Sequence, residues 1–312
     1  MFNAEVKEGF VKSYTDKISV RVACKQFFDI AQKYEEQWGA DLYTRTIEEL
    51  TPFLDDVSGL TVQSRKTTLS ILKSYIRWCM AQNDILGVCE DILKINSVPS
   101  DKFKTQTVTS PIHLQRYLDS VFAPEEDKTV ENIYRTYFWM AYAGINQNDA
   151  FKVKNKDVDF SEMVIRYNEK VYPIYREGVK AIKYCVELDY IRSERTNTGK
   201  FVILDRIDSD LVMRGRKSVF TSKSMQERTS RKQKEALDSG KTDLRLSYFK
   251  VWISGLFYRM YMDEISGIKP DFLPFVKEID SVKGTKNRPY ELKNRAKYYH
   301  EDYLCWKDSL NR

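Results

Sequence analysis

The sequence predicts a mainly α-helical protein of two domains, with a small β-hairpin or sheet in the second domain. Apolar residues recur every three to four positions over most of the chain, which is the spacing of amphipathic helices. Residues 141–175 depart from this spacing, because a helix end, a turn at Gly144 and a second short helix lead into two β-rich runs. A length of 312 residues is enough for two ordinary domains, each with its own core.

The first domain is predicted at residues 1–97. Between positions 3 and 95 the amphipathic segments are separated by helix breakers, so we expect a four-helix bundle or a fold close to one. Residues 98–111 are polar and lack an apolar period, which is typical of an interdomain linker. Ser110 and Pro111 then fit the cap and the first residue of a helix.

The second domain is predicted at residues 112–312. Helices are expected at 112–122, 130–143 and 178–191, with the hairpin before the last of them. The apolar run 201–204 fits either a short strand or a helix start. The remainder is predicted to be mostly helix, with breaks at Gly240, Gly267 and Gly284.

Composition sets broad limits on function. Lysine and arginine outnumber aspartate and glutamate by 51 to 45, and this surplus of +6 permits a polyanionic partner without demonstrating one. The five cysteines are scattered and only two histidines exist, so we expect reduced, buried cysteines, no metal site and no cofactor. No apolar run reaches the roughly 20 residues that span a bilayer, and no signal pattern opens the chain, so we expect a cytoplasmic protein without a membrane partner.

A first candidate for DNA binding is the helix predicted within residues 59–82. Hydroxyl and cationic side chains at a helix N-terminus can hold phosphate through the free backbone N–H groups and the positive end of the helix dipole. The residues of this kind are Ser64, Arg65, Lys66, Thr67, Lys73 and Arg77. The alternative is a capped and solvated helix face.

A second candidate is the basic segment 214–250, which holds 11 lysines or arginines against four acidic residues, a surplus of +7. Clustered cations bind backbone phosphates with a gain from counterion release. The candidate contacts are Arg214, Arg216, Lys217, Lys223, Arg228, Arg231, Lys232 and Arg245. A disordered basic loop is the alternative.

Two segments carry a family resemblance. GINQNDA (144–150), followed by KDVDF (156–160), resembles the start of the catalytic domain of tyrosine recombinases and phage integrases, and TDLR (242–245) resembles their H-D-L-R segment. The resemblance places Asn146 where the family has its first catalytic arginine and Thr242 where it has a histidine, whereas Arg245 matches the second arginine. The other vestigial candidates that it implies are the hairpin lysine Lys170 and the C-terminal tyrosines Tyr298, Tyr299 and Tyr303.

These departures predict a protein without recombinase activity. Transesterification at phosphate needs two guanidinium groups, a proton donor and a tyrosine nucleophile, and a neutral amide at position 146 cannot replace a bidentate arginine. The runner-up hypothesis is a divergent but active site-specific recombinase, in which Arg135 or Arg176 stands in for the lost arginine. A third hypothesis is a protein-interaction module that kept the fold and lost DNA.

A narrower resemblance rests on aromatic patterns. SYIRWC (74–79), ISGLFYRMYMDE (253–264) and YLCWK (303–307) resemble integrase-derived phage proteins, the MrpR-type lytic-cycle repressors of SPβ-like phages. The resemblance implies a SAM-like, core-binding N-terminal domain and a tyrosine-recombinase-like second domain with an incomplete catalytic set.

The function that this resemblance implies is that of a transcriptional repressor. It would be encoded by a prophage in a bacterial host, bind operator sites in double-stranded DNA and maintain lysogeny. Further DNA contacts are expected in the second domain from Asn146, Gln147, Lys154, Lys156 and Lys170. A phage-encoded antagonist or regulator is a further partner that the resemblance leaves open, and the sequence does not set the oligomeric state.

Overall fold

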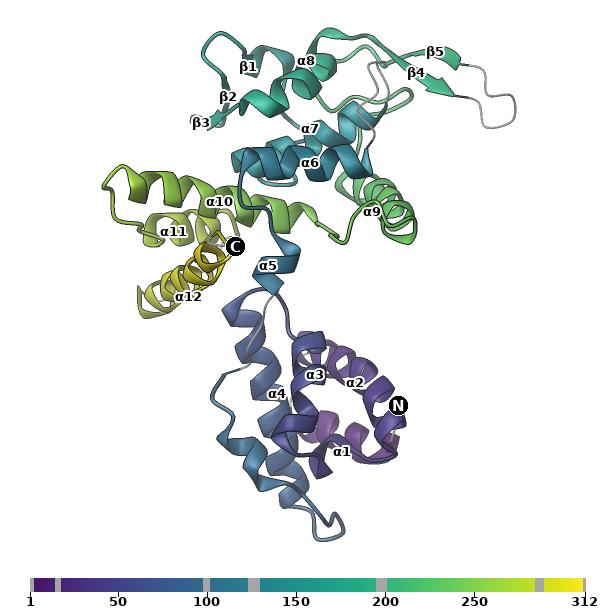
Figure 1. Cartoon of the computed structure of the whole chain (residues 1–312), viewed down its shortest axis with the longest axis vertical. Coiled ribbons are helices and arrows are strands. Elements are labelled where there is room, and N and C mark those ends of the chain that lie inside the picture. The colour runs from purple at the N-terminus through teal and green to yellow at the C-terminus, as the bar shows by residue number, and fades with distance from the viewer. Residues whose placement is uncertain are drawn as a thin grey trace. The chain divides into compact units, whose positions relative to one another are not determined.

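The computed structural model describes residues 3–14, 18–97, 102–122, 130–194, 201–283 and 289–310 (Figure 1). The contacts of the chain divide it into two compact units. The first unit consists of Met1–Lys102 and Asp271–Leu304, and the second of Phe103–Pro270 and Cys305–Arg312. The division after Lys102 falls within the predicted linker, whereas the grouping of Asp271–Leu304 with the first unit differs from the predicted second domain.

The first unit is helical. Its helices are α1 (Ala4–Tyr14), α2 (Ile18–Trp38), α3 (Ile47–Val57), α4 (Val62–Met80), α11 (Leu273–Lys283) and the greater part of α12 (Pro289–Asp308), with the 3-10 turns η1 (Leu42–Thr44) and η2 (Glu90–Lys94). The prediction of four N-terminal helices is confirmed. Phe10, Phe28 and Tyr75 join α1, α2 and α4 in one core, with ring centroids 5.0 to 6.0 Å apart.

The second unit combines helices with two small antiparallel sheets. Its helices are α6 (Pro111–Val121), α7 (Val130–Ala143), α8 (Val179–Glu187), α9 (Ser222–Asp238) and α10 (Tyr248–Ile265), with the 3-10 turns η3 (Asn155–Asp157) and η4 (Arg176–Gly178). Its strands are β1 (Val158–Asp159), β2 (Val164–Tyr167), β3 (Lys170–Pro173), β4 (Tyr190–Glu194) and β5 (Phe201–Asp205). The predicted fold class, mainly α with a small sheet, is confirmed.

Helix α7 forms the centre of the second unit, because every residue from Asn132 to Ala143 is buried. Helix α10 packs directly against it. A Cβ atom at Gly255 would lie 1.9 Å from the carbonyl oxygen of Tyr142, so only glycine permits this approach. The two predicted ends of α7 agree with the structure.

The predicted hairpin is confirmed as β2 and β3 of a three-stranded sheet in the order β1-β2-β3. Tyr167 pairs with Lys170 across a two-residue turn. The turn residues Asn168 and Glu169 have positive φ angles of 48° and 61°, as such tight hairpins require. The predicted second short helix is reduced to the 3-10 turn η3.

The helix predicted at residues 178–191 is wrong at its C-terminal end. Helix α8 stops at Glu187, and β4 begins at Tyr190 because its backbone pairs with β5 in the register Tyr190 to Asp205. Residues 201–204, for which a strand and a helix start were both open, lie in strand β5. In Figure 1 these two strands form a ribbon that projects from the second unit.

The predicted linker is only partly a solvated segment. Residues 102–106 form the short helix α5 (Lys102–Gln106), and Phe103 and Val108 are buried. Val108 donates its backbone N–H to Ser254 and accepts a hydrogen bond from the Trp306 indole, so α10 and α12 hold this part of the chain. Residues 98–101 and the predicted break at Gly284 lie outside the described residues. The expected cap is confirmed, since the Ser110 hydroxyl accepts from His113 N at the start of α6.

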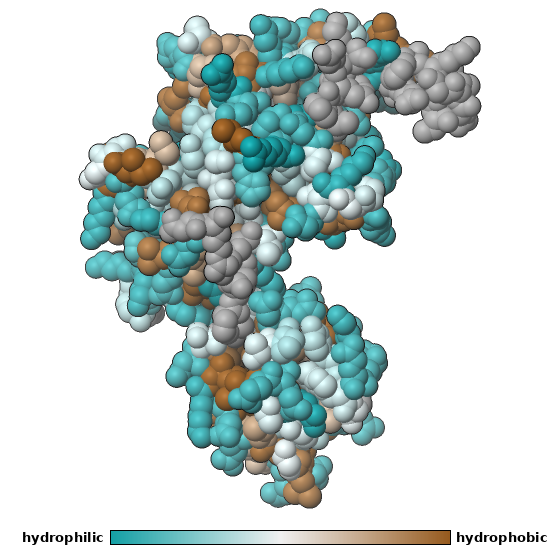
Figure 2. Space-filling model, viewed as in Figure 1, coloured by the Kyte–Doolittle hydropathy of each residue, from teal (hydrophilic) through white to brown (hydrophobic). Residues whose placement is uncertain are grey.

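Hydrophilic residues cover most of the face seen in Figure 2, with apolar patches scattered among them. None of the helices in the described part of the chain combines the length and the apolar character that a bilayer span needs. Among the same residues, no three His, Cys, Asp or Glu side chains gather as metal ligands would.

Candidate nucleic-acid interface

Helix α4 presents a cationic face in the first unit. Thr61 caps the helix by accepting from Ser64 N, and the apolar residues of α4, such as Leu72 and Ile76, enter the core. The side chains outside the core recur at helical spacing and are Gln63, Lys66, Thr67, Ser70, Lys73, Ser74 and Arg77, called the α4 face below. No acidic residue occurs between Val62 and Met80, so the cations of this face have no carboxylate on their own helix.

Two residues predicted to join this face point elsewhere. The Arg65 guanidinium is buried, donates to the carbonyl of Leu60 at 2.6 Å and lies 3.8 Å from a carboxylate oxygen of Asp302. The Ser64 hydroxyl lies over Gly59, where an added Cβ would be 2.1 Å from it. Arg65 is a correction, because a buried arginine held by internal acceptors cannot also reach a phosphate. Ser64 is half-buried and stays a prediction.

Helix α12 contributes to the start of the α4 face. The Lys66 ammonium lies 3.9 Å from the centre of the Tyr298 ring and 3.7 Å from the Glu301 carboxylate. Asp302, one residue further along, accepts a hydrogen bond from Val62 N at 2.7 Å and so satisfies a free N–H group at the start of α4. Lys73 and Arg77 lie further along the α4 face, and Arg77 is exposed.

The basic segment of the second unit is largely folded. Residues 222–238 form α9, which begins at the Thr221 capping box, so the alternative of a disordered basic loop is wrong for this part. The predicted cations that are exposed are Arg216, Lys217, Lys223, Arg228, Arg231 and Arg245. Lys232 is half-buried and lies 3.9 Å from Glu131 and 3.6 Å from Glu235.

Arg214 is a further correction, because it is buried. Its guanidinium donates to the carbonyls of Ser209 and Leu188 and to the Asp189 carboxylate at 2.8 Å. Arg206, which sequence reasoning missed, lies beside it and donates to the carbonyls of Cys185, Leu188, Val212 and Arg214. The two arginines fix the loop after β5, and nothing in the local sequence distinguishes them from exposed cations.

The segments that resemble the recombinase catalytic region meet in the second unit. Trp252 donates its indole N–H to the carbonyl of Gly144 at 3.0 Å, and Tyr248 donates its hydroxyl to the carbonyl of Ile145 at 2.9 Å. Both aromatic residues belong to α10, which follows Arg245 directly. The turn that carries Asn146 therefore packs against the helix that follows the surviving arginine.

The side chains at these positions form hydrogen bonds within the second unit. Asn146 is exposed, and its side-chain oxygen accepts from Asn148 N within the turn. Gln147 donates to the Tyr137 hydroxyl at 2.6 Å, and Thr242 accepts from Leu244 N. At position 146, where the family resemblance implies the first catalytic arginine, the chain therefore has an exposed neutral amide.

The two arginines proposed as stand-ins for the lost arginine differ in burial. Arg135 is buried and donates to the Phe122 carbonyl and the Asp119 carboxylate, which removes it as a candidate. Arg176 is exposed in η4. The Arg259 guanidinium lies beside the turn, because it donates to the Tyr142 carbonyl and is 2.7 Å from the position that a Cβ atom of Gly144 would take.

The three C-terminal tyrosines lie on α12, in the part grouped with the first unit. Tyr303 is 1% exposed and its ring lies 5.8 Å from that of Phe272. Tyr299 packs edge-on against Phe275, and Tyr298 lies under Lys66. All three act as packing residues in this structure.

The remaining predicted residues lie at the small sheet. Lys154 forms an ion pair with Asp210 at 2.8 Å, and Lys156 is exposed in η3. Lys170 is half-buried at the start of β3, directly after the hairpin turn, as the resemblance implies for the hairpin lysine.

Comparison with known proteins gives a family match for the N-terminal part of the first unit. Residues 1–82 match the family model described as "MrpR, N-terminal core-binding domain". The MrpR resemblance is confirmed for this region, which contains α1 to α4. No curated protein matches the chain.

Two solved structures resemble the chain at low similarity. The XerA recombinase crystal structure is 12% identical over 99% of this chain and 96% of its own, with a TM-score of 0.38. The Tn1549 transposon integrase, solved in complex with circular intermediate DNA, is 13% identical over 93% of both chains, also with a TM-score of 0.38. Scores at this level carry no weight for the fold or the site, which rest on the contacts described above.

Proposed function

We propose that the chain binds double-stranded DNA at specific sites without cutting it, and acts as a transcriptional repressor. The α4 face carries this proposal. It belongs to the region that matches a core-binding domain and presents Lys66, Lys73 and Arg77 on a helix without acidic residues. Cations attract the phosphate backbone of any duplex, and this gives affinity.

Polar side chains among these cations support site-specific binding. Gln63, Thr67 and Ser70 are exposed on the same face as Lys66 and Lys73. Amide and hydroxyl groups of this kind form hydrogen bonds with base edges, whereas lysine and arginine mainly hold the backbone. A helix with both kinds of side chain on one face suits the major groove.

The neutral residues at positions 146 and 242 support binding without cleavage. The resemblance to MrpR-type repressors and the loss of these two groups favour the same function, which is repression of phage lytic genes and maintenance of lysogeny. The second candidate, a divergent active recombinase, is favoured by one observation: Arg245 is exposed, and Tyr248, three residues further along the chain, donates its hydroxyl to the carbonyl of Ile145, the neighbour of Asn146.

The direct test of DNA binding is charge reversal on the α4 face. The probes are genomic DNA fragments that the purified wild-type chain retains. The doubly substituted chain Lys73→Glu, Arg77→Glu should bind these fragments about 10- to 100-fold more weakly than wild type, and its affinity should fall less steeply with salt. Electrophoretic mobility shifts over a salt series measure both quantities.

Lys33→Glu provides the matched control, since Lys33 is exposed on α2 in the same unit and outside the α4 face. It should bind DNA like wild type. Equal DNA affinities of Lys33→Glu and the double variant would reject the α4 face, and wild-type chain that retains no DNA would favour the protein-interaction hypothesis.

A further inference from the structure

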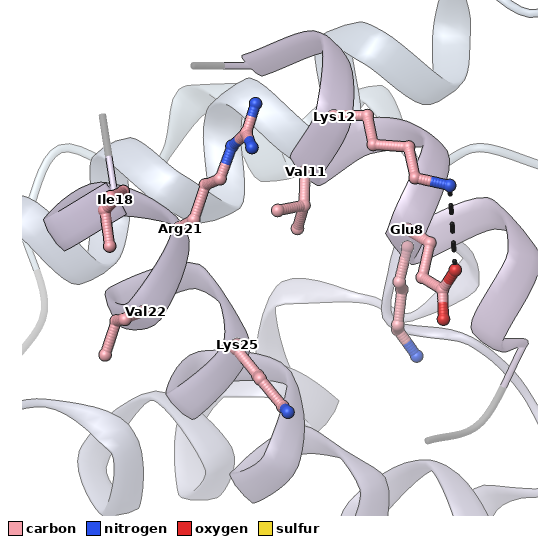
Figure 3. Close-up of a pocket in the computed structure, with 8 residues that line it drawn as sticks. Glu8, Val11, Lys12, Ile18, Arg21, Val22 and Lys25 are labelled. Atoms are coloured by element: carbon pink, nitrogen blue, oxygen red, sulfur yellow. Dashed lines mark ion pairs between the residues drawn. The ribbon is translucent and has the colours of Figure 1, made fainter. Parts of the chain in front are cut away.

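A groove between α1 and α2 has no role in the proposed DNA interface. Its volume is about 380 Å³, within the usual range of ligand-binding pockets. The residues that line it are Lys7, Glu8, Val11, Lys12, Ile18, Arg21, Val22 and Lys25. In Figure 3, Val11 lies between Arg21 and Lys12, and Val22 and Lys25 come from the facing helix α2.

The apolar part of this groove is exposed to solvent. Ile18 is 78% and Val22 50% exposed, although both stand on a helix whose opposite side buries Phe27 and Phe28 in the core. Ile18 and Val22 are four residues apart, so they form one stripe along α2. Apolar side chains grouped in a groove and rimmed by charges are typical of a protein-binding site.

The rim of the groove is positively charged. Lys12, Arg21 and Lys25 surround it, and among the described lining residues Glu8 is the only carboxylate. The Glu8 to Lys12 pair is 3.9 Å long with both side chains mostly exposed, so it neutralises the rim only weakly. Lys7 is buried and contacts Glu35 and Asp41, and it does not add to this surface charge.

The groove and the α4 face adjoin different residues of α2. Val20 and Ala23 of α2 line a second hollow together with Gln63, Lys66 and Thr67 of α4. Ile18, Val22 and Lys25 instead line the hollow shared with α1. The two hollows therefore use different residues of α2, which point in different directions from the helix.

We infer that the α1–α2 groove binds an acidic amphipathic helix of a partner protein. Such a helix places apolar side chains on Val11, Ile18 and Val22 and carboxylates beside Lys12, Arg21 and Lys25. Duplex DNA would use the cations but gain nothing from the apolar floor. This inference does not depend on the proposed DNA function.

A second copy of the chain fits the groove less well. Helix α3 is an acidic segment of the first unit, and its Glu48, Glu49, Asp55 and Asp56 are exposed. The apolar residues of α3, Leu50, Phe53 and Leu54, are buried in its own core. Helix α3 therefore offers the charges without the apolar side chains that the groove floor requires.

The test uses a fluorescein-labelled helical peptide with leucines at i, i+4 spacing flanked by glutamates, and the same peptide with every glutamate replaced by glutamine. Fluorescence anisotropy with the full chain should show that the acidic peptide binds at least about 10-fold more tightly than the glutamine peptide. Val22→Ser should weaken binding of the acidic peptide by about 10-fold, because the floor loses an apolar contact.

Ile30→Ser is the matched control, since Ile30 is a partly exposed apolar residue of α2 outside the groove. It should bind the peptide like wild type, and circular dichroism should show all variants folded. Three results would each overturn the inference: equal peptide binding by Val22→Ser and Ile30→Ser, displacement of the peptide by duplex DNA, or self-association of the chain that Val22→Ser abolishes in sedimentation experiments.

Discussion

Asp302 connects α12 to the start of α4 through a single carboxyl group. It is 2% exposed, accepts from Val62 N, and lies near the charged groups of Arg65, Lys66 and Glu301. Burial raises the pKa of the Asp302 carboxyl to about 7, against the opposing effects of the Val62 hydrogen bond and the Arg65 charge. Burial likewise raises the pKa of Glu35 to about 7.

A raised carboxyl pKa makes the folded state bind more protons than the unfolded state between the two pKa values. The stability that Asp302 contributes is therefore present below pH 3.8 and is lost as the pH rises through about 7. Asp302→Asn keeps the acceptor for Val62 N but removes this titration. Between pH 5 and pH 8 the variant should gain stability relative to wild type, by at most about 3 kcal/mol.

Urea unfolding at the two pH values measures this difference. Glu301→Gln, a partly exposed neighbour on α12, serves as the control and should keep most of the wild-type pH dependence, because burial raises the Asp302 pKa more than the Glu301 charge does. A wild-type chain that gains stability over Asp302→Asn as the pH rises would contradict this role for Asp302.

The burial of individual arginines could not be predicted from the sequence. Arg65 and Arg77 lie on one helix, yet Arg65 is buried and forms an ion pair at 3.8 Å with Asp302, which is 237 positions away in the chain. Arg214 is buried because backbone carbonyls and Asp189 surround it. Whether an arginine meets solvent or internal acceptors depends on tertiary contacts, and composition alone cannot report them.

At the scale of elements, local signals predicted most of the structure. The periodicity and breakers of α1 to α4, the Ser110 cap of α6 and the bounds of α7 all agree with the structure. Helix α8 was predicted too long because the apolar spacing continues through Ile191, where pairing with Leu204 of β5 selects a strand. Long-range pairing overrides local propensity at such positions.

The contact between α7 and α10 gives a prediction for the second unit. Gly255→Ala places a methyl group against the Tyr142 backbone, and neither backbone can move without separating two buried helices. We expect destabilisation of about 3 kcal/mol or more. Urea unfolding followed by circular dichroism checks this value.

Gly267→Ala separates packing from backbone strain. Gly267 follows α10 with a φ of 85°, and a Cβ there meets nothing within 4 Å. The substitution should cost about 1 kcal/mol through backbone strain alone. If Gly255→Ala proved no more destabilising than Gly267→Ala, the close approach of α7 and α10 would be refuted.

At the scale of the whole molecule, the overall charge of +6 says little about DNA binding, whereas the positions of the charged residues identify candidate contacts. Arg65 and Arg214 leave the predicted binding set, while Lys73, Arg77, Arg216, Arg231 and Arg245 stay in it as surface or partly buried cations. The family resemblance could be predicted from short motifs. The α1–α2 groove could not, because its exposed apolar residues continue the same helical period as the core.

The central claim is that the chain holds duplex DNA and lacks the groups needed to cut it. The most direct measurement incubates the full chain with nicked suicide duplexes made from the genomic fragments that it retains, and divides each sample between a native and a denaturing gel. The account predicts a shifted band on the native gel and no covalent protein–DNA band on the denaturing gel. A covalent band that disappears in Tyr298→Phe, Tyr299→Phe or Tyr303→Phe would contradict it.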